Sequence, residues 1–148
     1  RAHLTSGELN YRQNLVFLPG FWRRLSIFGS YTRLHFDAYE NFRRPKQMAN
    51  GGVSFDHRGL SLRWNIAWVP RFRRAATPAN GWSTVDGDRL THDAQFAYRV
   101  SRLVTVFASG RNVFNRPQRR YYGTARSDVI SRNSDYGAIW NVGVRGVF

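Results

Sequence analysis

The chain has 148 residues and a mass of 17.2 kDa, and its 23 Lys and Arg residues against 9 Asp and Glu residues give a formal charge of +14. An aromatic content of 16% and a hydrophobic content of 42% exclude an intrinsically disordered chain, which needs few aromatic and apolar residues. The absence of Cys excludes disulfides, thiolate metal sites and a Cys nucleophile, and the basic charge suits anionic partners.

The first predicted strand spans residues 4–18, where Leu9 and Tyr11 alternate with Asn10 and Arg12. Alternation with a period of two is typical of a strand with one apolar and one polar face. The longest apolar stretch, residues 15–22, is interrupted by Pro and Gly and falls far short of the roughly 20 residues of a transmembrane helix. Because Pro and Gly favour turns, we predict that the strand ends in a tight turn at residues 19–20.

The next two predicted strands, residues 25–37 and 46–56, are rich in β-forming residues, but their faces are undecided. The fourth, residues 60–72, has the clearest alternation in the chain. Its apolar residues Leu60, Leu62, Trp64, Ile66, Trp68 and Phe72 alternate with Ser61, Arg63, Asn65, Arg71 and Arg73.

Three more strands are predicted at residues 90–100, 103–114 and 136–148. In the first of them His92 is the one polar residue on the apolar face, and the faces of the second are undecided. The third has one face made of Tyr136, Ala138, Trp140, Val142, Val144, Gly146 and Phe148.

The connections alternate between tight turns, near residues 19–20, 57–59 and 101–102, and longer links, residues 38–45, 74–88 and 115–135. Short periplasmic turns alternating with long extracellular loops are typical of a membrane β-barrel. Strands of this length, tilted about 40°, reach roughly 30 Å and can cross a bilayer. We predict an all-β fold in which about seven long antiparallel strands form an open arc of a transmembrane barrel.

Period alone also fits a soluble sandwich, whose apolar face packs against a second sheet. The bulk of the aromatic residues favours the membrane, because Trp and Tyr near strand ends anchor a barrel at the bilayer interface. We expect lipid contact at the apolar-face residues Leu62, Trp64, Ile66, Phe96, Tyr98, Val142 and Val144.

The whole chain, residues 1–148, resembles the carboxyl-terminal part of the β-barrel of a TonB-dependent outer-membrane receptor. The similar segments are residues 14–20, 25–32 and 45–50, the stretch 106–115 with its Arg-Asn-Val-Phe-Asn ending, and the final strand ending on Phe148. The resemblance implies a parent barrel of about 22 strands. It also implies a plug domain that is absent from this chain, which begins without Met and is expected to be part of a longer protein.

This resemblance implies an active-transport receptor in the outer membrane of a Gram-negative bacterium. It would import a scarce nutrient such as a ferric siderophore, cobalamin or an oligosaccharide, energised by the TonB complex through the missing amino-terminal part. Outer-membrane lipid, lipopolysaccharide and the barrel assembly machinery are the other expected partners. The assembly signal would be formed by Trp140, Val142, Val144 and Phe148. Two alternatives remain: a porin-like or structural barrel, and a soluble basic β-domain that binds nucleic acid.

The link at residues 115–135 holds the candidate ligand-binding residues Arg116, Arg119, Arg120, Tyr121, Tyr122 and Arg126. Guanidinium and aromatic groups suit an anionic chelate, through charge-assisted hydrogen bonds and ring contacts. A solvated loop without a ligand explains the same composition.

No catalytic motif of a hydrolase, zinc protease or phosphate-binding loop occurs. Asp86 and Asp88 flank Gly87 and are interpreted as turn residues, with too few neighbouring oxygens for calcium. The strand-spaced Arg63, Arg71, Arg99 and Arg145 form no single cluster, which favours a hydrated lumen over a nucleic-acid surface. We therefore predict no enzyme activity, no metal, no cofactor and no nucleic-acid partner.

Overall fold

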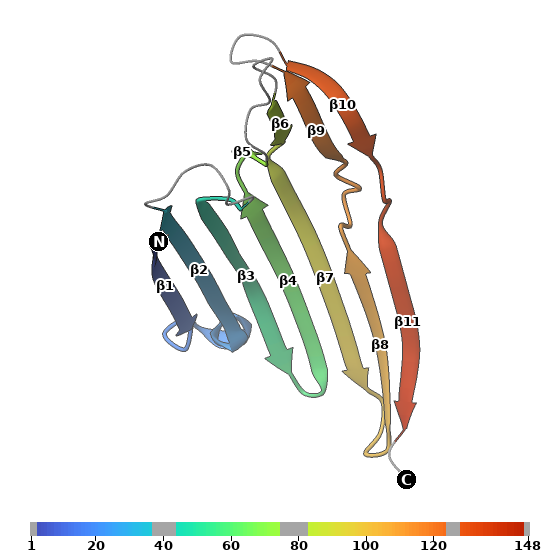
Figure 1. The fold of residues 1–148 in the computed structure, drawn as a ribbon. Helices are drawn as coiled ribbons and strands as arrows, with labels where there is room; N and C mark the ends of the chain where they lie inside the picture. The colour runs from blue at the N-terminus through green and yellow to red at the C-terminus, as the bar shows by residue number, and fades with distance from the viewer. Residues whose placement is uncertain (1–2, 37–43, 75–82, 124–127, 147–148) are drawn as a thin grey trace.

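The computed structural model describes residues 3–36, 44–74, 83–123 and 128–146. The fold is all-β, and its main sheet has seven antiparallel strands, as the sequence predicts (Figure 1). In spatial order these are β1 (Leu4–Asn14), β2 (Leu25–Phe36), β3 (Gln47–His57), β4 (Leu60–Val69), β7 (Arg89–Arg99), β8 (Val104–Arg111) and β11 (Ile139–Gly146). The sheet is open, with β1 and β11 as its edges. Among the described residues, no helix is long and apolar enough to cross a membrane.

Some strand ends differ from the prediction. The first strand stops at Asn14 rather than at residue 18, and a 3-10 helix, η1 (Gly20–Arg24), leads into β2. Pro19 lacks an amide hydrogen for the ladder and Gly20 takes a φ of +57°, so the chain turns here. The fourth strand stops at Val69, because Pro70 likewise has no N–H to donate.

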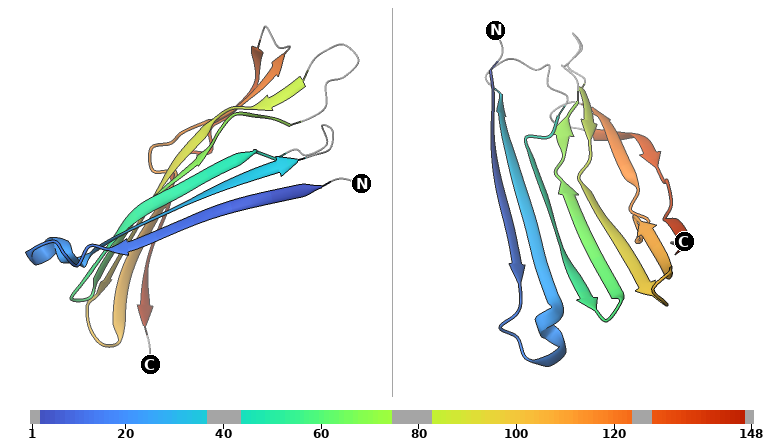
Figure 2. Two further views of the ribbon diagram at one scale, coloured as in Figure 1. Left: turned by 90° about the vertical axis from the view of Figure 1, so that its left-hand side faces the viewer. Right: turned by 90° about the horizontal axis from the view of Figure 1, so that it is seen from below.

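A second sheet lies beyond the ends of the long strands (Figures 1 and 2). It consists of β5 (Phe72–Arg73), β6 (Ser83–Asp86), β9 (Gln118–Gly123) and β10 (Asp128–Ser134), in the order β10-β9-β6-β5. The links predicted at residues 74–88 and 115–135 therefore contain short strands that the sequence analysis did not predict. Runs of two to seven residues are too short for a period of two to reveal them. Each of its strands is next along the chain to a strand of the main sheet: β10 precedes β11, β9 follows β8, β6 precedes β7 and β5 follows β4. The two sheets therefore have the same strand order in this region.

The strand register decides which residues share a face. Directly paired residues of an antiparallel ladder point to the same side. One row of pairs runs across six strands, through Leu25, Phe55, Leu62, Phe96, Ala108 and Val142. A parallel row contains Gln13, Ile27, Val53, Trp64, Ala94, Gly110 and Trp140. We call this side of the sheet the apolar face.

The opposite side, which we call the polar face, carries hydrogen-bonding side chains in the same register. One row across all seven strands consists of Asn14, Ser26, Ser54, Arg63, Gln95, Ser109 and Asn141. At one edge of this row the Ser26 hydroxyl donates to Asn14 Oδ1 at 2.7 Å. The two faces predicted from alternation in four strands therefore extend across the whole sheet.

The apolar face has almost no core of its own. Phe55, at 5% exposure, is the one buried large apolar side chain among the described residues, and Phe21 of η1 covers it, with ring centroids 4.3 Å apart. Val142 and Val144 are 81% and 69% exposed. Within the described part of the chain, the strands of the second sheet pair with one another beyond the ends of the long strands. The second sheet therefore does not cover the apolar face.

Candidate ligand-binding surface on the second sheet

Most of the predicted ligand-binding residues lie on β9. The strand contains Arg119, Arg120, Tyr121 and Tyr122, and Arg116 lies two residues before its start. Arg116, Arg119 and Tyr122 are exposed, whereas Arg120 and Tyr121 are half-buried. The remaining candidate, Arg126, lies outside the described residues. The structure therefore brings the predicted residues to one strand but divides them into exposed and packed groups.

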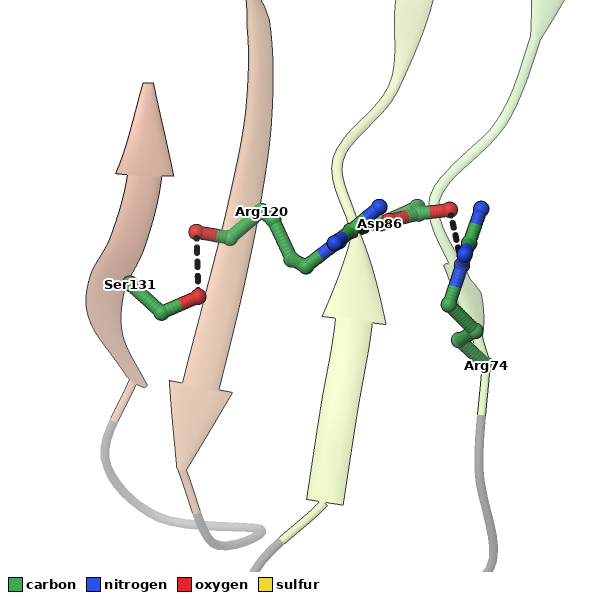
Figure 3. Close-up of polar contacts among 4 residues, drawn as sticks. All are labelled: Arg74, Asp86, Arg120 and Ser131. Carbon is green, nitrogen blue, oxygen red and sulfur yellow. Dashed lines mark hydrogen bonds and ion pairs between the residues drawn. The ribbon is translucent and has the colours of Figure 1, made fainter. Parts of the chain in front are cut away.

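Arg120 is held by a buried carboxylate, that of Asp86 (Figure 3). Asp86 ends β6 and its side chain is 5% exposed. Arg120 Nε donates to Asp86 Oδ1 and Arg74 Nε donates to Asp86 Oδ2, each at 2.9 Å. The carboxylate thus joins residues from three neighbouring strand segments. The interpretation of Asp86 as a turn residue was wrong, because its partners lie 12 and 34 residues away along the chain.

Other contacts tie β9 to its neighbours. The Ser131 hydroxyl of β10 donates to the Arg120 carbonyl at 3.3 Å, as Figure 3 shows. The guanidinium of Arg71 lies over the Tyr121 ring, 4.9 Å from its centroid. The amide of Gly87 donates to the Arg119 carbonyl at 2.9 Å. Arg120 and Tyr121 are therefore part of the internal packing of the second sheet.

Among the exposed candidates, Arg116 and Arg119 are the charged ones, and each carries a guanidinium. Such groups can pair with carboxylate or phosphate oxygens. Across the described part of the chain, no group of three His, Asp or Glu side chains is placed to hold a metal ion. The surface is suited to binding an anion through charge.

The Arg-Asn-Val-Phe-Asn segment forms the turn that separates β8 from β9. Asn112 has a φ of +51°, a left-handed conformation that Asn tolerates better than most residues. Its amide donates to Asp93 Oδ1 at 2.9 Å, and its side chain accepts from the Arg116 amide and donates to the carbonyls of Arg116 and Gly137. The motif that carries the family resemblance therefore has a structural role where the two sheets part.

The predicted assembly-signal residues lie on the edge strand β11. Trp140, Val142 and Val144 are exposed on its apolar face, and Phe148 lies outside the described residues. Their role as a signal stays a prediction. Sequence reasoning did not identify Arg74, which becomes a partner of Asp86 only through the pairing of β5 with β6.

Comparison of the chain with protein-family profiles, with curated proteins and with solved structures finds no match. Function must therefore be inferred from the two faces of the main sheet and from the chemistry of the second sheet.

Proposed function

We propose that this chain forms part of the wall of a β-barrel in the outer membrane of a Gram-negative bacterium. The observation that carries the proposal is the apolar face, which follows the register through the main sheet and has Phe55 as its one buried large apolar side chain within the described residues. Apolar surface left in water costs about 25 cal/mol per Å², so this face requires a cover. Lipid hydrocarbon supplies that cover without a second protein layer.

Strand length supports the membrane as the cover. β2 has 12 residues, which at about 3.3 Å each and a tilt of about 40° cross roughly 30 Å, the thickness of the hydrocarbon core. Aromatic residues lie toward both ends of the apolar face, with Phe21 and Trp22 at the η1 end and the paired row of Tyr31 and Trp68 near the other. Membrane barrels carry such girdles at both interfaces.

A barrel wall must also satisfy its edges. Hydrocarbon does not tolerate unpaired backbone N–H and C=O groups, so a membrane-spanning sheet has to close. The proposal therefore requires partner strands for β1 and β11, supplied by barrel strands outside this sequence. The polar face, with Arg63, Gln95 and Ser109, would line the hydrated lumen.

We assign the barrel to the TonB-dependent receptor class, on the resemblance of the sequence. In this proposal the second sheet stands outside the membrane and its exposed Arg116 and Arg119 attract an anionic nutrient, with a ferric siderophore as the best fit to the charge. The TonB complex energises uptake, and the barrel assembly machinery inserts the chain. A porin-like barrel has the same two faces but takes up solute passively. Uptake that stops when a protonophore collapses the proton gradient supports the receptor over the porin.

The membrane proposal is tested by cysteine accessibility, because the chain contains no Cys of its own. Single Cys residues are placed in the native gene product, in its own membranes, at Val142 or Leu62 on the apolar face. Asn141 and Arg63 are the matched controls on the polar face of the same strands. A membrane-impermeant maleimide should label the control positions at least tenfold faster, because lipid shields the other two from water.

Equal labelling of positions 142 and 141 in intact membranes contradicts the proposal. Recovery of the protein from the soluble fraction also contradicts it, and favours a soluble β-domain. In that case, binding to nucleic acid that persists at physiological salt would identify the basic charge as a nucleic-acid surface.

A further inference from the structure

The polar face becomes strongly basic over β4, β7, β8 and β11. Its residues on these four strands include the five arginines Arg63, Arg89, Arg99, Arg111 and Arg145, and a single acid, Asp93. Asp93 lies opposite Asn65 on β4 and already accepts a hydrogen bond from the Asn112 amide. Across the described part of the chain, neither Arg63 nor Arg145 has a carboxylate within ion-pair distance.

This arrangement contrasts with the second sheet. There the buried carboxylate of Asp86 forms an ion pair with both Arg74 and Arg120. The fold therefore provides an internal acid for two arginines that hold strands together. It provides none for Arg63 and Arg145, whose positive potential is left for an external anion.

Two of the five polar-face arginines, Arg63 and Arg145, border one hollow. The hollow has a volume of about 400 Å³, and its lining includes Arg63, Gln95, Thr105, Phe107, Ser109 and Arg145. This volume lies within the range of about 300 to 1,000 Å³ that small-molecule sites occupy. The hollow is thus large enough for a small organic ligand and is lined mainly by hydrogen-bonding groups.

The register sets the spacing of the charged groups. Arg63 belongs to the row of Gln95 and Ser109, whereas Arg145 pairs with Thr105, four residues further along β8. Four residues of strand span about 13 Å, and β7 and β8 lie between the strands of Arg63 and Arg145, so the two arginines lie at opposite ends of the hollow. Phe107 lies between these rows, and the Arg145 guanidinium is 5.8 Å from its ring centroid. A ligand with one anionic group would occupy one end only, whereas a ligand with two would engage both arginines.

We propose that this hollow binds a small organic anion that carries two carboxylate or phosphate groups separated by an apolar body. Arg63 and Arg145 hold the two charged ends, since the guanidinium fork matches both oxyanions in a bidentate geometry. Thr105, Ser109 and Gln95 supply further hydrogen-bond donors, and Phe107 packs against the apolar body. This site is distinct from the exposed arginines on β9, and it does not depend on what covers the apolar face.

The test uses terephthalate, which has two carboxylates on one ring, and benzoate, which has one. Each is titrated calorimetrically into the purified native gene product in a nonionic detergent at low salt, where screening of exposed charges is weak. Terephthalate should bind at least tenfold more tightly than benzoate. Arg63→Gln and Arg145→Gln should each weaken terephthalate binding at least tenfold and leave benzoate within about threefold.

Arg111→Gln is the matched control, because Arg111 lies on the polar face, on β8, outside the hollow. The affinity of this variant for terephthalate should stay within twofold of the wild-type value. Arg145→Lys keeps the charge and loses the fork, so it should weaken binding by a smaller factor than Arg145→Gln. It also serves as the variant of choice if the glutamine substitution prevents folding. The proposal is overturned if the wild-type protein binds no terephthalate at millimolar concentration. It is equally overturned if the folded Arg111 and Arg145 variants lose the same affinity, because that result would indicate a diffuse charge effect.

Discussion

Asp86 shows what a single buried carboxylate does for the second sheet. It accepts one hydrogen bond on each oxygen, from Arg74 and Arg120, and so joins the segments around β5, β6 and β9. Charge-assisted hydrogen bonds are about twice as strong as neutral ones. The side chains of Arg74 and Arg120 are 44% and 28% exposed, so solvent screens part of this interaction.

We predict that Asp86→Asn destabilises the second sheet by about 1 to 3 kcal/mol, the usual range for losing hydrogen bonds to a charged group in a partly exposed site. Two guanidiniums would then lie together without a counter-charge. Limited proteolysis and hydrogen exchange of β6 and β9 measure the effect. Asp88→Asn, two residues away at an exposed position, should change protection very little. Equal protection of β6 in both variants would show that the ion pairs contribute nothing.

Residues of this kind set the limit of what could be predicted for the site. The sequence identified Arg120 as one of a group of basic residues on the link at residues 115–135, and the structure places it on β9 within that link. It could not show that Asp86 neutralises Arg120, because the two are 34 residues apart and meet only through the pairing of β6 with β9. Local patterns contain no information on such long-range pairs, so Arg120 and Tyr121 were not separated from the exposed Arg116 and Arg119.

At the scale of strands, aromatic residues cover glycines on the neighbouring strand. Phe28 pairs directly with Gly52, and Phe107 with Gly143, both on the polar face. On the apolar face Trp140 pairs with Gly110. A Cβ at Gly143 would lie 2.6 Å from the Phe107 ring, and one at Gly110 would lie 2.6 Å from the Trp140 ring. These contacts fix the register, since an aromatic ring over a glycine stabilises the pair at one alignment only.

The same contacts explain why three strands had undecided faces. Phe28 and Phe107 are apolar residues on the polar face, so they break the period of two in residues 25–37 and 103–114. The glycines Gly51 and Gly52 remove the signal from residues 46–56. Strong alternation in residues 60–72 and 90–100 was sufficient to predict their faces. The faces of the other strands are assigned by their pairing with these two strands. That pairing cannot be read from the sequence.

We predict that Gly52→Ala destabilises the main sheet by about 1 to 3 kcal/mol, the usual cost of overpacking. Its Cβ would overlap the Trp64 carbonyl oxygen and approach the Phe28 ring, and the carbonyl cannot move without disrupting the pairing of β3 with β4. Gly7→Ala on β1, where nothing lies within 4 Å, is the control and should be neutral. Denaturant midpoints in detergent measure both. A Gly52→Ala midpoint as high as that of Gly7→Ala would contradict this strand register.

At the scale of the whole molecule, the main sheet has two well-separated faces and no second layer over the apolar one within the described residues. A soluble sandwich would cover this face with another sheet. Here the second sheet lies beyond the ends of the long strands instead, and it is Phe21 of η1 that packs against Phe55. The all-β class and the seven strands could be predicted because long strands alternate strongly. The second sheet could not, because its strands are short.

These features lead to a prediction for the 148-residue chain on its own. Folding in water must offset the conformational entropy of ordering, about 1 to 2 kcal/mol per residue, mainly by burying apolar surface. Because Phe55 is the one buried large apolar side chain in the described part, we expect that the chain cannot supply enough burial in water. Its edge strands β1 and β11 also present unpaired backbone groups that promote aggregation.

We therefore expect the chain to aggregate in plain buffer, with strong binding of a hydrophobic dye and no cooperative unfolding transition. In detergent micelles, which cover the apolar face, its main strands should become protected from proteolysis even though the edges stay unpaired. Sedimentation, dye fluorescence and thermal scans in the two solvents measure the difference. Val142→Arg on the apolar face should reduce the protection in micelles, whereas Asn141→Arg on the polar face of the same strand should leave it unchanged. A monodisperse 17.2 kDa species that unfolds cooperatively in plain buffer would contradict the membrane assignment, because such a species would have to bury this face within a single soluble chain.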